Sequence, residues 1–354
     1  MNPIKNVLLK AWRQYGEYDP TIWIYYYCMN EKKKKKNNVK IETCLHSSKK
    51  AIKHLWGKMS WWFDFYNTVG DKDKVHLYFP DPWYYKNIDA RLNDWKVCIA
   101  VDDKSFYDYY FTDVNRPKTL LKICGGIILD EKSRAISLND AVNICRSAGG
   151  VIVKPSFDSV GGHGITFWKD GCERDIESIL KGSDNVVIQA LIEQHPVLSA
   201  IHPDSVNTIR IMTMTTENGV KDISSILRMG IGKSKVDNVS SGGIAIGIDN
   251  NGVLKGKAFS GNGTCYTKHP DGADLVGVVI PAYHECMDIC KATAPRFARF
   301  SRLTSWDFAV GSDGKPILIE ANLHFGELDF HQMCNGPIFG NEASTMDMIK
   351  KYLK

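Results

Sequence analysis

Residues 306–322 read Trp-Asp-Phe-Ala-Val-Gly-Ser-Asp-Gly-Lys-Pro-Ile-Leu-Ile-Glu-Ala-Asn. Two apolar runs flank a polar, glycine-containing segment, which predicts two β-strands joined by a tight turn. Side chains alternate between the faces of a strand, so Glu320 and Asn322 point the same way, and the hairpin can bring Asp307 beside them. Two carboxylates and one amide oxygen suit magnesium, which prefers oxygen ligands. An ordinary hairpin with polar ends is the alternative.

A second informative segment is the apolar run at residues 151–155, which includes Lys154 and leads into a glycine-rich loop. Glycines let backbone N–H groups approach an anion, and Lys154 would add a positive charge for phosphates. The loop lacks the Gly-Lys-Ser/Thr of a Walker loop and leads into a strand-like segment, unlike the dinucleotide fingerprint. A plain glycine hairpin is the alternative. The loop residues of interest are Ser159, Gly161, Gly162 and Gly164.

Together the two segments resemble the ATP-grasp superfamily, whose hallmarks are a lysine-bearing strand, a flexible glycine loop and a late Asp…Glu-x-Asn metal site. More specifically, the chain is similar to the sugar-transfer-associated ATP-grasp proteins found with polysaccharide biosynthesis genes. The similarity keeps its order from about residue 75 to about residue 340. The segments that carry it are 188–196, 205–210, 227–230, 236–238, 242–244 and 269–271, with Gln332 and the Gly-Pro pair at 336–337.

The resemblance implies an α+β fold, in which two α+β subdomains clasp ATP. The helical spacing of apolar and aromatic residues predicts a mainly helical N-terminal domain that precedes them. Residues 1–98 are expected to form the helical domain, which is rich in aromatic residues and lysine. Residues 99–191 would form the small subdomain with the glycine loop as a lid, and residues 192–354 the large subdomain with the metal site. The N-terminal aromatic residues are expected to pack in a core, with a sugar-binding platform as the alternative.

Several local elements are predicted directly. Residues 96–101 are expected to form a strand and residues 102–111 a helix, and the Asp-Pro pair at 81–82 an extended or turn link. Ser137 can cap a helix over residues 138–148, which the following glycines end. Further strands are predicted at residues 186–192, 208–215 and 222–228.

The resemblance also implies an ATP site. Lys104 and Lys154 would contact the phosphates, and Glu193 is the nearest candidate for the ribose. Asp307, Glu320 and Asn322 would hold Mg²⁺, with Mn²⁺ as the alternative ion. The segment between the subdomains, where backbone groups meet the adenine edge, contains Gln189, Ala190, Leu191 and Ile192.

Two arginines are the candidate catalytic residues. Arg210 and Arg228 lie on neighbouring predicted strands, and the guanidinium fork suits a transferring phosphoryl group or an acyl phosphate. The alternative is that both arginines pair with acids on a solvated sheet face. The candidate substrate-binding residues are Lys233, Asp237, Asn238, His269 and Gln332.

The implied activity is that of an ATP-dependent carboxylate–amine ligase. It would form an amide bond through an acyl phosphate and release ADP and phosphate. The substrates would be a small-molecule carboxylate and an amine, such as an amino acid joined to a sugar acid or glycan precursor for a capsule or surface polysaccharide. An ATP-grasp kinase and a non-catalytic module that binds nucleotide or glycan are the alternatives.

Composition fits a cytoplasmic enzyme: the chain has 354 residues, of which 44% are hydrophobic and 24% charged, and no run suggests a transmembrane segment or signal peptide. Its ten cysteines form no Cys-x-x-Cys pair, so we expect reduced, mostly buried thiols. The lysine run at 32–36 contributes to the net charge of +5. It is expected to be solvated, with an acidic polysaccharide or anionic membrane as alternative partners. No nucleic-acid motif accompanies it.

Overall fold

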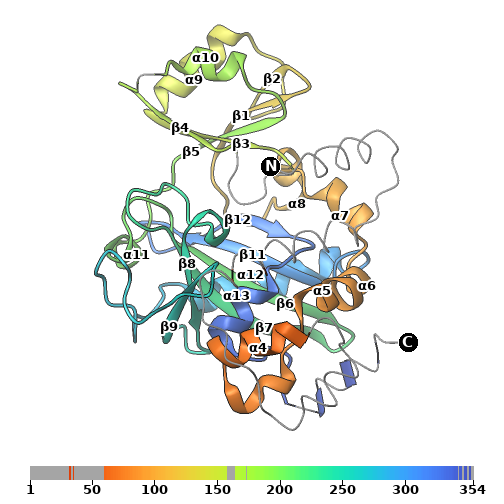
Figure 1. The fold of residues 1–354 in the computed structure, drawn as a ribbon. Coiled ribbons are helices and arrows are strands. Elements are labelled where there is room, and N and C mark those ends of the chain that lie inside the picture. The colour runs from red at the N-terminus through yellow and green to blue at the C-terminus, as the bar shows by residue number, and fades with distance from the viewer. Residues whose placement is uncertain are drawn as a thin grey trace, which may run out of the picture.

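The computed structural model describes residues 32, 35, 60–157, 164–172, 174–341, 343–344, 347–348 and 351. Within them the strands form two separate sheets, and Figure 1 shows the smaller sheet above the larger one. The pairings within both sheets are antiparallel. Helices pack on both sheets, so the predicted α+β class is confirmed.

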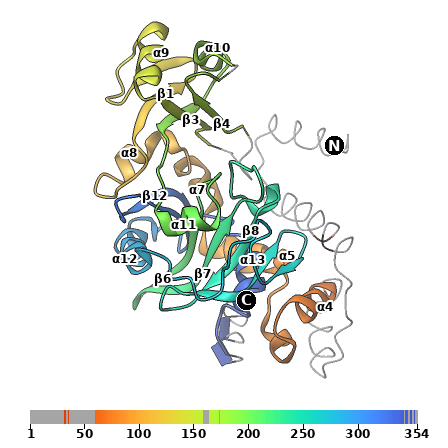
Figure 2. The same ribbon diagram turned by 90° about the vertical axis from the view of Figure 1, so that its left-hand side faces the viewer.

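The small sheet consists of β1 (Thr119–Cys124), β2 (Ile127–Asp130), β3 (Gly150–Pro155), β4 (Thr166–Lys169) and β5 (Val186–Ala190), in the spatial order β2-β1-β5-β3-β4. Helices α9 (Leu138–Ser147) and α10 (Ile176–Lys181) cover one of its faces (Figure 2). Ser137 caps α9 as predicted, because its hydroxyl oxygen accepts a hydrogen bond from the N–H of Asp140. The predicted strand that contains Lys154 is confirmed as β3.

The large sheet consists of β6 (Thr208–Thr216), β7 (Gly219–Met229), β8 (Ile244–Ile248), β9 (Leu254–Ser260), β10 (Cys265–Tyr266), β11 (Leu303–Val310) and β12 (Pro316–Asn322), in the spatial order β10-β9-β8-β7-β6-β11-β12. Its helices are α11 (Pro196–Ile201), α12 (Tyr283–Thr293) and α13 (Leu328–Asn335), with 3-10 turns at Val239–Ser241 and Ala294–Phe297. The predicted hairpin is confirmed as β11–β12, in which Asp307 lies opposite Glu320. Its turn uses Gly314 at φ 78°, which a residue without Cβ adopts readily.

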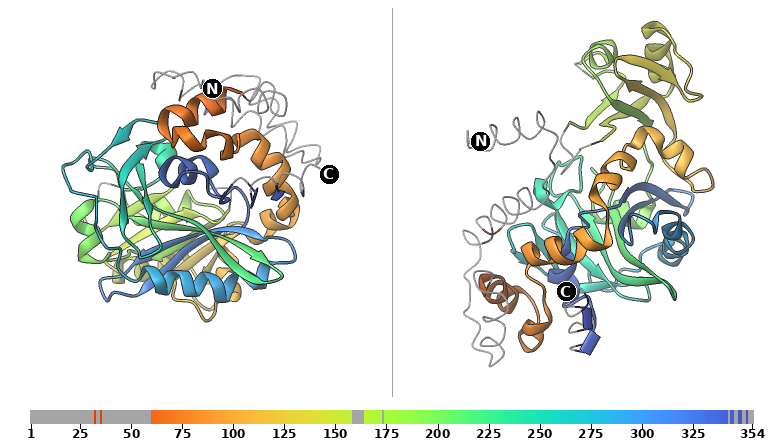
Figure 3. Two further views of the ribbon diagram at one scale, coloured as in Figure 1. Left: turned by 90° about the horizontal axis from the view of Figure 1, so that it is seen from below. Right: turned by 90° about the vertical axis from the view of Figure 1, so that its right-hand side faces the viewer.

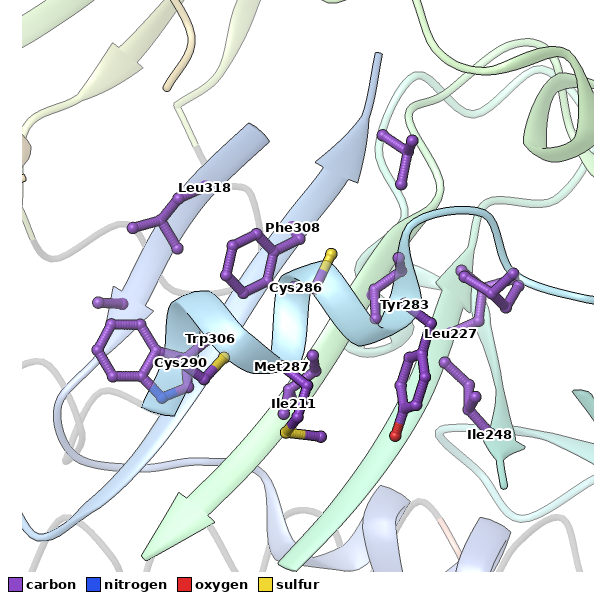
Figure 4. Close-up of a cluster of buried hydrophobic side chains, with 14 of the residues drawn as sticks. Ile211, Leu227, Ile248, Tyr283, Cys286, Met287, Cys290, Trp306, Phe308 and Leu318 are labelled. Atoms are coloured by element: carbon purple, nitrogen blue, oxygen red, sulfur yellow. The ribbon is translucent and has the colours of Figure 1, made fainter. Parts of the chain in front are cut away.

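Hydrophobic side chains cover both faces of the large sheet, because neighbouring residues of each strand point to opposite sides. On one face, Ile211, Leu227 and Trp306 pack against α12 (Figure 4). On the other face, Met212 and Ile226 belong to a cluster that includes α13 and the N-terminal aromatic residues. Figure 3, left, shows this layered arrangement from below. The large sheet is therefore the central layer of the molecule.

The residues described between positions 60 and 110 are mainly helical. Trp62 and Phe65 are buried there, which confirms the predicted aromatic packing. The Tyr66 hydroxyl donates a hydrogen bond to Asp81 over 2.6 Å inside the same cluster. The elements are α4 (Ser60–Val69), a 3-10 helix (Lys72–Leu77), α5 (Asp81–Tyr84), a π-helical turn (Tyr85–Asp89), α6 (Ala90–Leu92), α7 (Trp95–Val101), a second 3-10 helix (Lys104–Phe106) and α8 (Tyr107–Tyr110).

Two local predictions about this region are wrong. Residues 96–101 form most of helix α7, because Trp95 and Cys98 are buried one helical turn apart. Short apolar runs of this length fit a helix or a strand equally well. The Asp81–Pro82 pair begins α5 instead of forming an extended link, because proline is tolerated in the first turn of a helix. The helical part continues to Tyr110, while the division at residue 98 stays a prediction.

The lysine run is not wholly solvated. Lys35 is fully buried, and its ammonium lies 2.8 Å from the carboxylate of Asp329 on α13. The prediction of an exposed run is therefore wrong for Lys35. Lys32 lies with its ammonium 5.3 Å from the ring centre of Trp61, a cation–π arrangement. The helices predicted before residue 30 lie outside the described residues.

Every cysteine in the described segments is free, and the reduced state stays a prediction. Four of these eight thiols are buried, so the expectation of mostly buried thiols holds for half of them. Burial raises the pKa of Cys286 and Cys290, which keeps both as neutral thiols inside the core. None of the helices in these segments combines the length and apolar character needed to cross a bilayer.

Gln332 joins α13 to the N-terminal helices, which gives a test of the fold. Its amide accepts from the Phe79 N–H (3.0 Å) and donates to the Phe79 carbonyl (2.9 Å), and the side chain is fully buried. Gln332→Leu removes both hydrogen bonds and should lower the free energy of unfolding by about 2–4 kcal/mol. Urea denaturation measures the loss.

The matched control is Asn143→Leu on the exposed side of α9, which should change the free energy of unfolding by less than about 0.5 kcal/mol. Equal midpoints for Gln332→Leu and the unmodified protein would contradict the proposed link.

Candidate active site

A cavity of about 980 Å³ lies between the two sheets. Its small-sheet wall includes Ile152 and Lys154 of β3 and Phe167 of β4, and its large-sheet wall includes Arg228 of β7 and Asp307 of β11. A cavity of this size can enclose a nucleotide or a similar ligand. The small-sheet wall thus combines apolar groups with a lysine, and charged groups line the large-sheet wall.

Two lysines enter this cavity from different elements. Lys154 reaches it from the end of β3, and Lys104 from the start of a 3-10 helix that Asp103 caps. The Lys104 N–H donates to the Ser156 carbonyl over 2.7 Å, which holds the helix start against the strand end. The Lys104 ammonium lies 2.8 Å from Glu320 Oε1. The structure therefore brings both sequence-predicted lysines to one place, where a polyanion could bind.

Burial lowers the pKa of Lys154 to about 8, and repulsion from Lys104 adds to the effect. Glu320 and Asp237 act in the opposite direction but do not cancel it. Lys154 is thus close to its titration point at neutral pH, and an anion bound beside it would favour the protonated form.

The glycine loop is described only at its ends. Ser159, Gly161 and Gly162 lie outside the described residues, so their expected contacts stay predictions. Gly164 is exposed at φ +81°, and a Cβ there would lie 2.8 Å from the Pro155 ring. Both facts favour glycine at the point where the loop rejoins β4.

The segment that leaves β5 forms another wall of the cavity. Ala190, Leu191, Ile192 and Glu193 line it, and their contacts with a nucleotide stay a prediction. Gln189 does not line it, because its side chain is buried towards Thr119. The Glu193 carbonyl accepts a hydrogen bond of 2.8 Å from the Ser312 N–H, which fixes this segment to the turn of the β11–β12 hairpin.

A buried ionic cluster forms the floor of the site. Arg210 of β6 holds Asp307 of β11 through two parallel hydrogen bonds, Nε to Oδ1 at 2.7 Å and a terminal nitrogen to Oδ2 at 2.6 Å. Arg228 reaches the same Oδ2 at 3.1 Å and Asp237 at 3.2 Å. Burial raises the pKa of Asp307, but the two arginines outweigh it, so the net shift of the pKa is downward. Both arginines pair with acids, yet in a buried position, not on the solvated face given as the alternative.

Glu327 is a member of the cluster that the sequence analysis missed. It forms an ion pair with Arg210 and lies 3.6 Å from Arg228. The residue precedes α13 at φ 58°, a conformation that non-glycine residues seldom adopt. The sequence offered one clue to Glu327: it is an acid five positions after Asn322, and Arg210 and Arg228 require acidic partners if they are buried. No local pattern identifies such a residue, because its conformation depends on the surrounding contacts.

The three predicted metal ligands lie together. Asp307 and Glu320 are opposite each other across the hairpin, and the Asn322 amide nitrogen is 3.4 Å from Asp307 Oδ2. Two carboxylates and an amide fit a hard cation such as Mg²⁺. To offer its oxygen to an ion, the Asn322 amide would have to face the other way, since its nitrogen now donates to Asp307 and to the Ser305 carbonyl. The donor set fits the ion, and the side-chain arrangement would change slightly on binding.

The predicted substrate residues separate into two groups. Asp237 and Asn238 line the cavity, beside Lys235 and Asp204, which the sequence analysis did not single out. Lys233, His269 and Gln332 do not line it. The expectation for these three is corrected: Lys233 is exposed outside the cavity, His269 is buried against the Gly230 carbonyl, and Gln332 is bonded to Phe79. His195 caps the start of α11, because its Nδ1 accepts a hydrogen bond from the Val197 N–H.

The chain was compared with known proteins. The model of the sugar-transfer associated ATP-grasp family matches residues 85–347. No curated protein matches. Similar solved structures include D-alanyl-alanine synthetase A from Vibrio cholerae O1 biovar eltor str. N16961, with 10% identity and a TM-score of 0.41 over 71% of this chain and 65% of that chain.

Two further similar structures are ligases of other kinds. ATP-grasp ligase PsnB complexed with minimal precursor has 15% identity and a TM-score of 0.40, over 72% of this chain and 62% of that chain. D-cycloserine synthetase DcsG has 14% identity and a TM-score of 0.39, over 73% of this chain and 72% of that chain. The chain spans less than two thirds of the length of D-alanyl-alanine synthetase A and of PsnB.

The ionic cluster predicts unequal effects for two similar substitutions. Asp307→Asn leaves buried Arg210 without its main counter-charge and should lower the free energy of unfolding by about 3–5 kcal/mol. Glu320→Gln also removes one negative charge, but Glu320 is 29% exposed, so the loss should be smaller. Urea denaturation of both variants checks this order. Equal losses, or a larger loss for Glu320→Gln, would contradict the assigned role of the Arg210–Asp307 pair.

Proposed function

The chain belongs to the sugar-transfer-associated ATP-grasp family, and we propose that it is an ATP-dependent carboxylate–amine ligase. The observation that carries the proposal is the cavity between the sheets, where Lys104 and Lys154 meet Asp307 and Glu320. Cations for the phosphates and oxygen ligands for a metal ion thus face one enclosed space. This combination suits phosphoryl transfer, in which positioning and charge neutralisation supply most of the catalysis.

ATP would bind with its base beside the segment 190–192 and the apolar side chains of Ile152 and Phe167, all of which line the cavity. Lys104 and Lys154 would contact the phosphates. Glu193 would contact the ribose, since it follows directly on that segment. Ser159, Gly161 and Gly162 would close over the phosphates from the loop and exclude water from the reacting groups.

Asp307, Glu320 and Asn322 would hold Mg²⁺, which when bound neutralises charge on the phosphates. The chain prepares these ligands: Arg210 fixes both oxygens of Asp307, and the hairpin register fixes Glu320 opposite it. Arg210 does not line the cavity, so it would act as a positioning residue. Arg228 does line the cavity and would contact the reacting carboxylate directly.

The reaction would proceed in two steps. A substrate carboxylate oxygen would attack the γ-phosphorus of ATP, the bond to the β–γ bridging oxygen would break, and ADP would leave with that oxygen. The amine would then attack the acyl carbon, the bond between that carbon and the phosphate oxygen would break, and the nitrogen would lose a proton. Arg228 would stabilise the negative charge that develops on the acyl phosphate.

The far end of the cavity suits an acceptor with charges of both signs. Lys235 and Asp204 form an ion pair with each other, and Asp237 pairs with Arg228. A substrate with both charges would exchange these pairs, its carboxylate binding Lys235 and its ammonium group binding Asp204 and Asp237. These groups favour an amino acid or a similar amine, with a sugar acid or glycan precursor as the carboxylate partner in polysaccharide biosynthesis. A volume of about 980 Å³ is enough for small molecules of this kind.

The deciding experiment is product analysis with ATP and Mg²⁺ against pools of amino acids, amines and sugar acids. The expected result is ADP, phosphate and a product with the mass of an amide, formed only when a carboxylate and an amine are both present. ADP release without any need for an amine would favour a kinase. Absence of turnover together with ATP binding would favour a non-catalytic binding module.

Glu320→Gln should reduce this turnover by at least about 100-fold, because the substitution removes a metal-ligand carboxylate but keeps the side-chain shape. The matched control is Glu177→Gln, an exposed acid paired with Lys181 on α10, which should keep near-normal turnover. ADP formation measured at saturating Mg²⁺ checks both. Near-normal turnover of Glu320→Gln would remove Glu320 from the metal site.

Nucleotide affinity should depend on the protonation of Lys154. Because the pKa of Lys154 in the free protein is about 8 and bound phosphates would raise it, ATP affinity should be highest below pH 8. It should fall above that pH by up to about tenfold per unit. Titration calorimetry from about pH 7 to about pH 9.5 measures this dependence. The range extends from about 1 unit below the pKa to about 1.5 units above it.

In Lys154→Gln the affinity should be weaker and its dependence on pH near 8 should be lost. Lys181→Gln, an exposed control on α10, should keep the original pH profile. The same slope in Lys154→Gln and the unmodified protein would assign the titration to another group.

A further inference from the structure

Two buried histidines and one aspartate meet beside the proposed active site. His202 ends helix α11, and His269 and Asp271 belong to the loop after β10. The two imidazoles are 1% and 2% exposed, whereas the Asp271 side chain is 39% exposed. The proposed ligase reaction uses none of these three side chains. The proposed reaction therefore does not explain why two buried imidazoles lie around one carboxylate.

Backbone carbonyls fix how the two rings are oriented. His202 Nε2 lies 3.3 Å from the Ser234 carbonyl, and His269 Nε2 lies 2.8 Å from the Gly230 carbonyl. A carbonyl only accepts hydrogen bonds, so Nε2 of each ring carries the hydrogen, and each neutral ring keeps a lone pair on Nδ1. The rings are stacked, with centres 5.5 Å apart. Both lone pairs are thus on the side of Asp271, and that of His269 accepts the Asp271 N–H.

The distances fit the edges of a coordination tetrahedron. Asp271 Oδ2 lies 3.4 Å from His202 Nδ1 and 3.6 Å from His269 Nδ1. A tetrahedral zinc ion with ligands at about 2.0–2.1 Å requires ligand atoms about 3.3–3.4 Å apart. The three side chains offer ligand atoms that all lie within 4.8 Å of one another, and the distances that exceed the tetrahedral edge would shorten when an ion binds.

We propose that His202 Nδ1, His269 Nδ1 and Asp271 Oδ2 bind a divalent transition-metal ion of the zinc type. Water would take the fourth position on the exposed side of Asp271. The carbonyls of Ser234 and Gly230 supply the outer contacts that ligating histidines commonly make, and the Gly232 N–H donates to Asp271 Oδ2 over 2.7 Å.

One contact has to change for the metal to bind. The Asp271 N–H donates to His269 Nδ1 over 3.1 Å, and this lone pair would turn to the ion instead. The backbone also leaves little space: a Cβ at Gly230 would lie 2.8 Å from His202 Nε2. Glycine at this position therefore permits the close approach of ring and strand end on which the site depends.

The ion would connect three chain segments that border the proposed acceptor end. Pro203 and Ser205 line the cavity directly after His202, and Lys235 and Val236 line it directly after Ser234. A metal bridge between these segments and the loop at 269–271 would hold that wall in place. The site differs in chemistry from the oxygen-only set of Asp307, Glu320 and Asn322, because nitrogen ligands favour zinc-type ions over Mg²⁺.

The test is metal binding by the full, untagged chain after chelator treatment. Co²⁺ is added in the presence of saturating Mg²⁺, which occupies the oxygen-only set. One bound Co²⁺ with the strong visible absorption of a tetrahedral nitrogen–oxygen site, displaced by one equivalent of Zn²⁺, is the expected result. Zn²⁺ should also raise the unfolding temperature. Absence of the absorption band and of any Zn²⁺-dependent stabilisation would overturn the proposal.

Variants locate the ion. His202→Gln and Asp271→Ala should each weaken Co²⁺ affinity by at least about 10-fold, while Glu320→Gln and the exposed control His284→Gln should leave it unchanged. If His202→Gln fails to fold, Asp271→Ala decides, because the Asp271 side chain is partly exposed. Unchanged binding in Asp271→Ala, or loss of the band in Glu320→Gln, would assign the ion to another place and overturn the proposal.

Discussion

The bidentate pair between Arg210 and Asp307 is the interaction on which the site and its surroundings depend. Both side chains are buried, so each would destabilise the protein without the other. The pair joins β6 to β11 in the middle of the large sheet, and Arg228 and Glu327 extend it to β7 and to the start of α13. The four charges stabilise one another only in this register, which in turn directs the carboxylates of the hairpin towards the cavity.

A neighbouring histidine stays neutral and so adds no further positive charge beside Arg210 and Arg228. His331 of α13 is fully buried beneath the two arginines, and burial lowers the pKa of its imidazole to about 3, with repulsion from Arg210 adding to the shift. The ring therefore stays neutral and adds no third positive charge. The small sheet contributes its lysines from the opposite side, where Lys104 already contacts Glu320. Opposite charges thus meet across the cavity before any ligand arrives.

Much of this arrangement could be predicted from the sequence, where local patterns were strong. The alternating hairpin predicted that Asp307 and Glu320 would face each other, and the apolar run before Lys154 predicted β3. Other features depend on tertiary contacts that no local pattern carries. Glu327 adopts a left-handed conformation only because the arginines attract it, and Lys35 pairs with a residue 294 positions away. Helix α7 was missed because its short apolar run fits two periodicities.

The aromatic residues before position 85 complete the hydrophobic core of the segment that the family model matches. The family match begins at residue 85, but Trp62, Phe63 and Tyr66 belong to the same hydrophobic cluster as Met212 and Ile226 of the large sheet. A fragment that began where the match begins would expose an apolar sheet face directly behind the charged floor. The segment that the family model matches therefore depends on the residues before it to complete its core, and substitutions in either part affect the packing of the other.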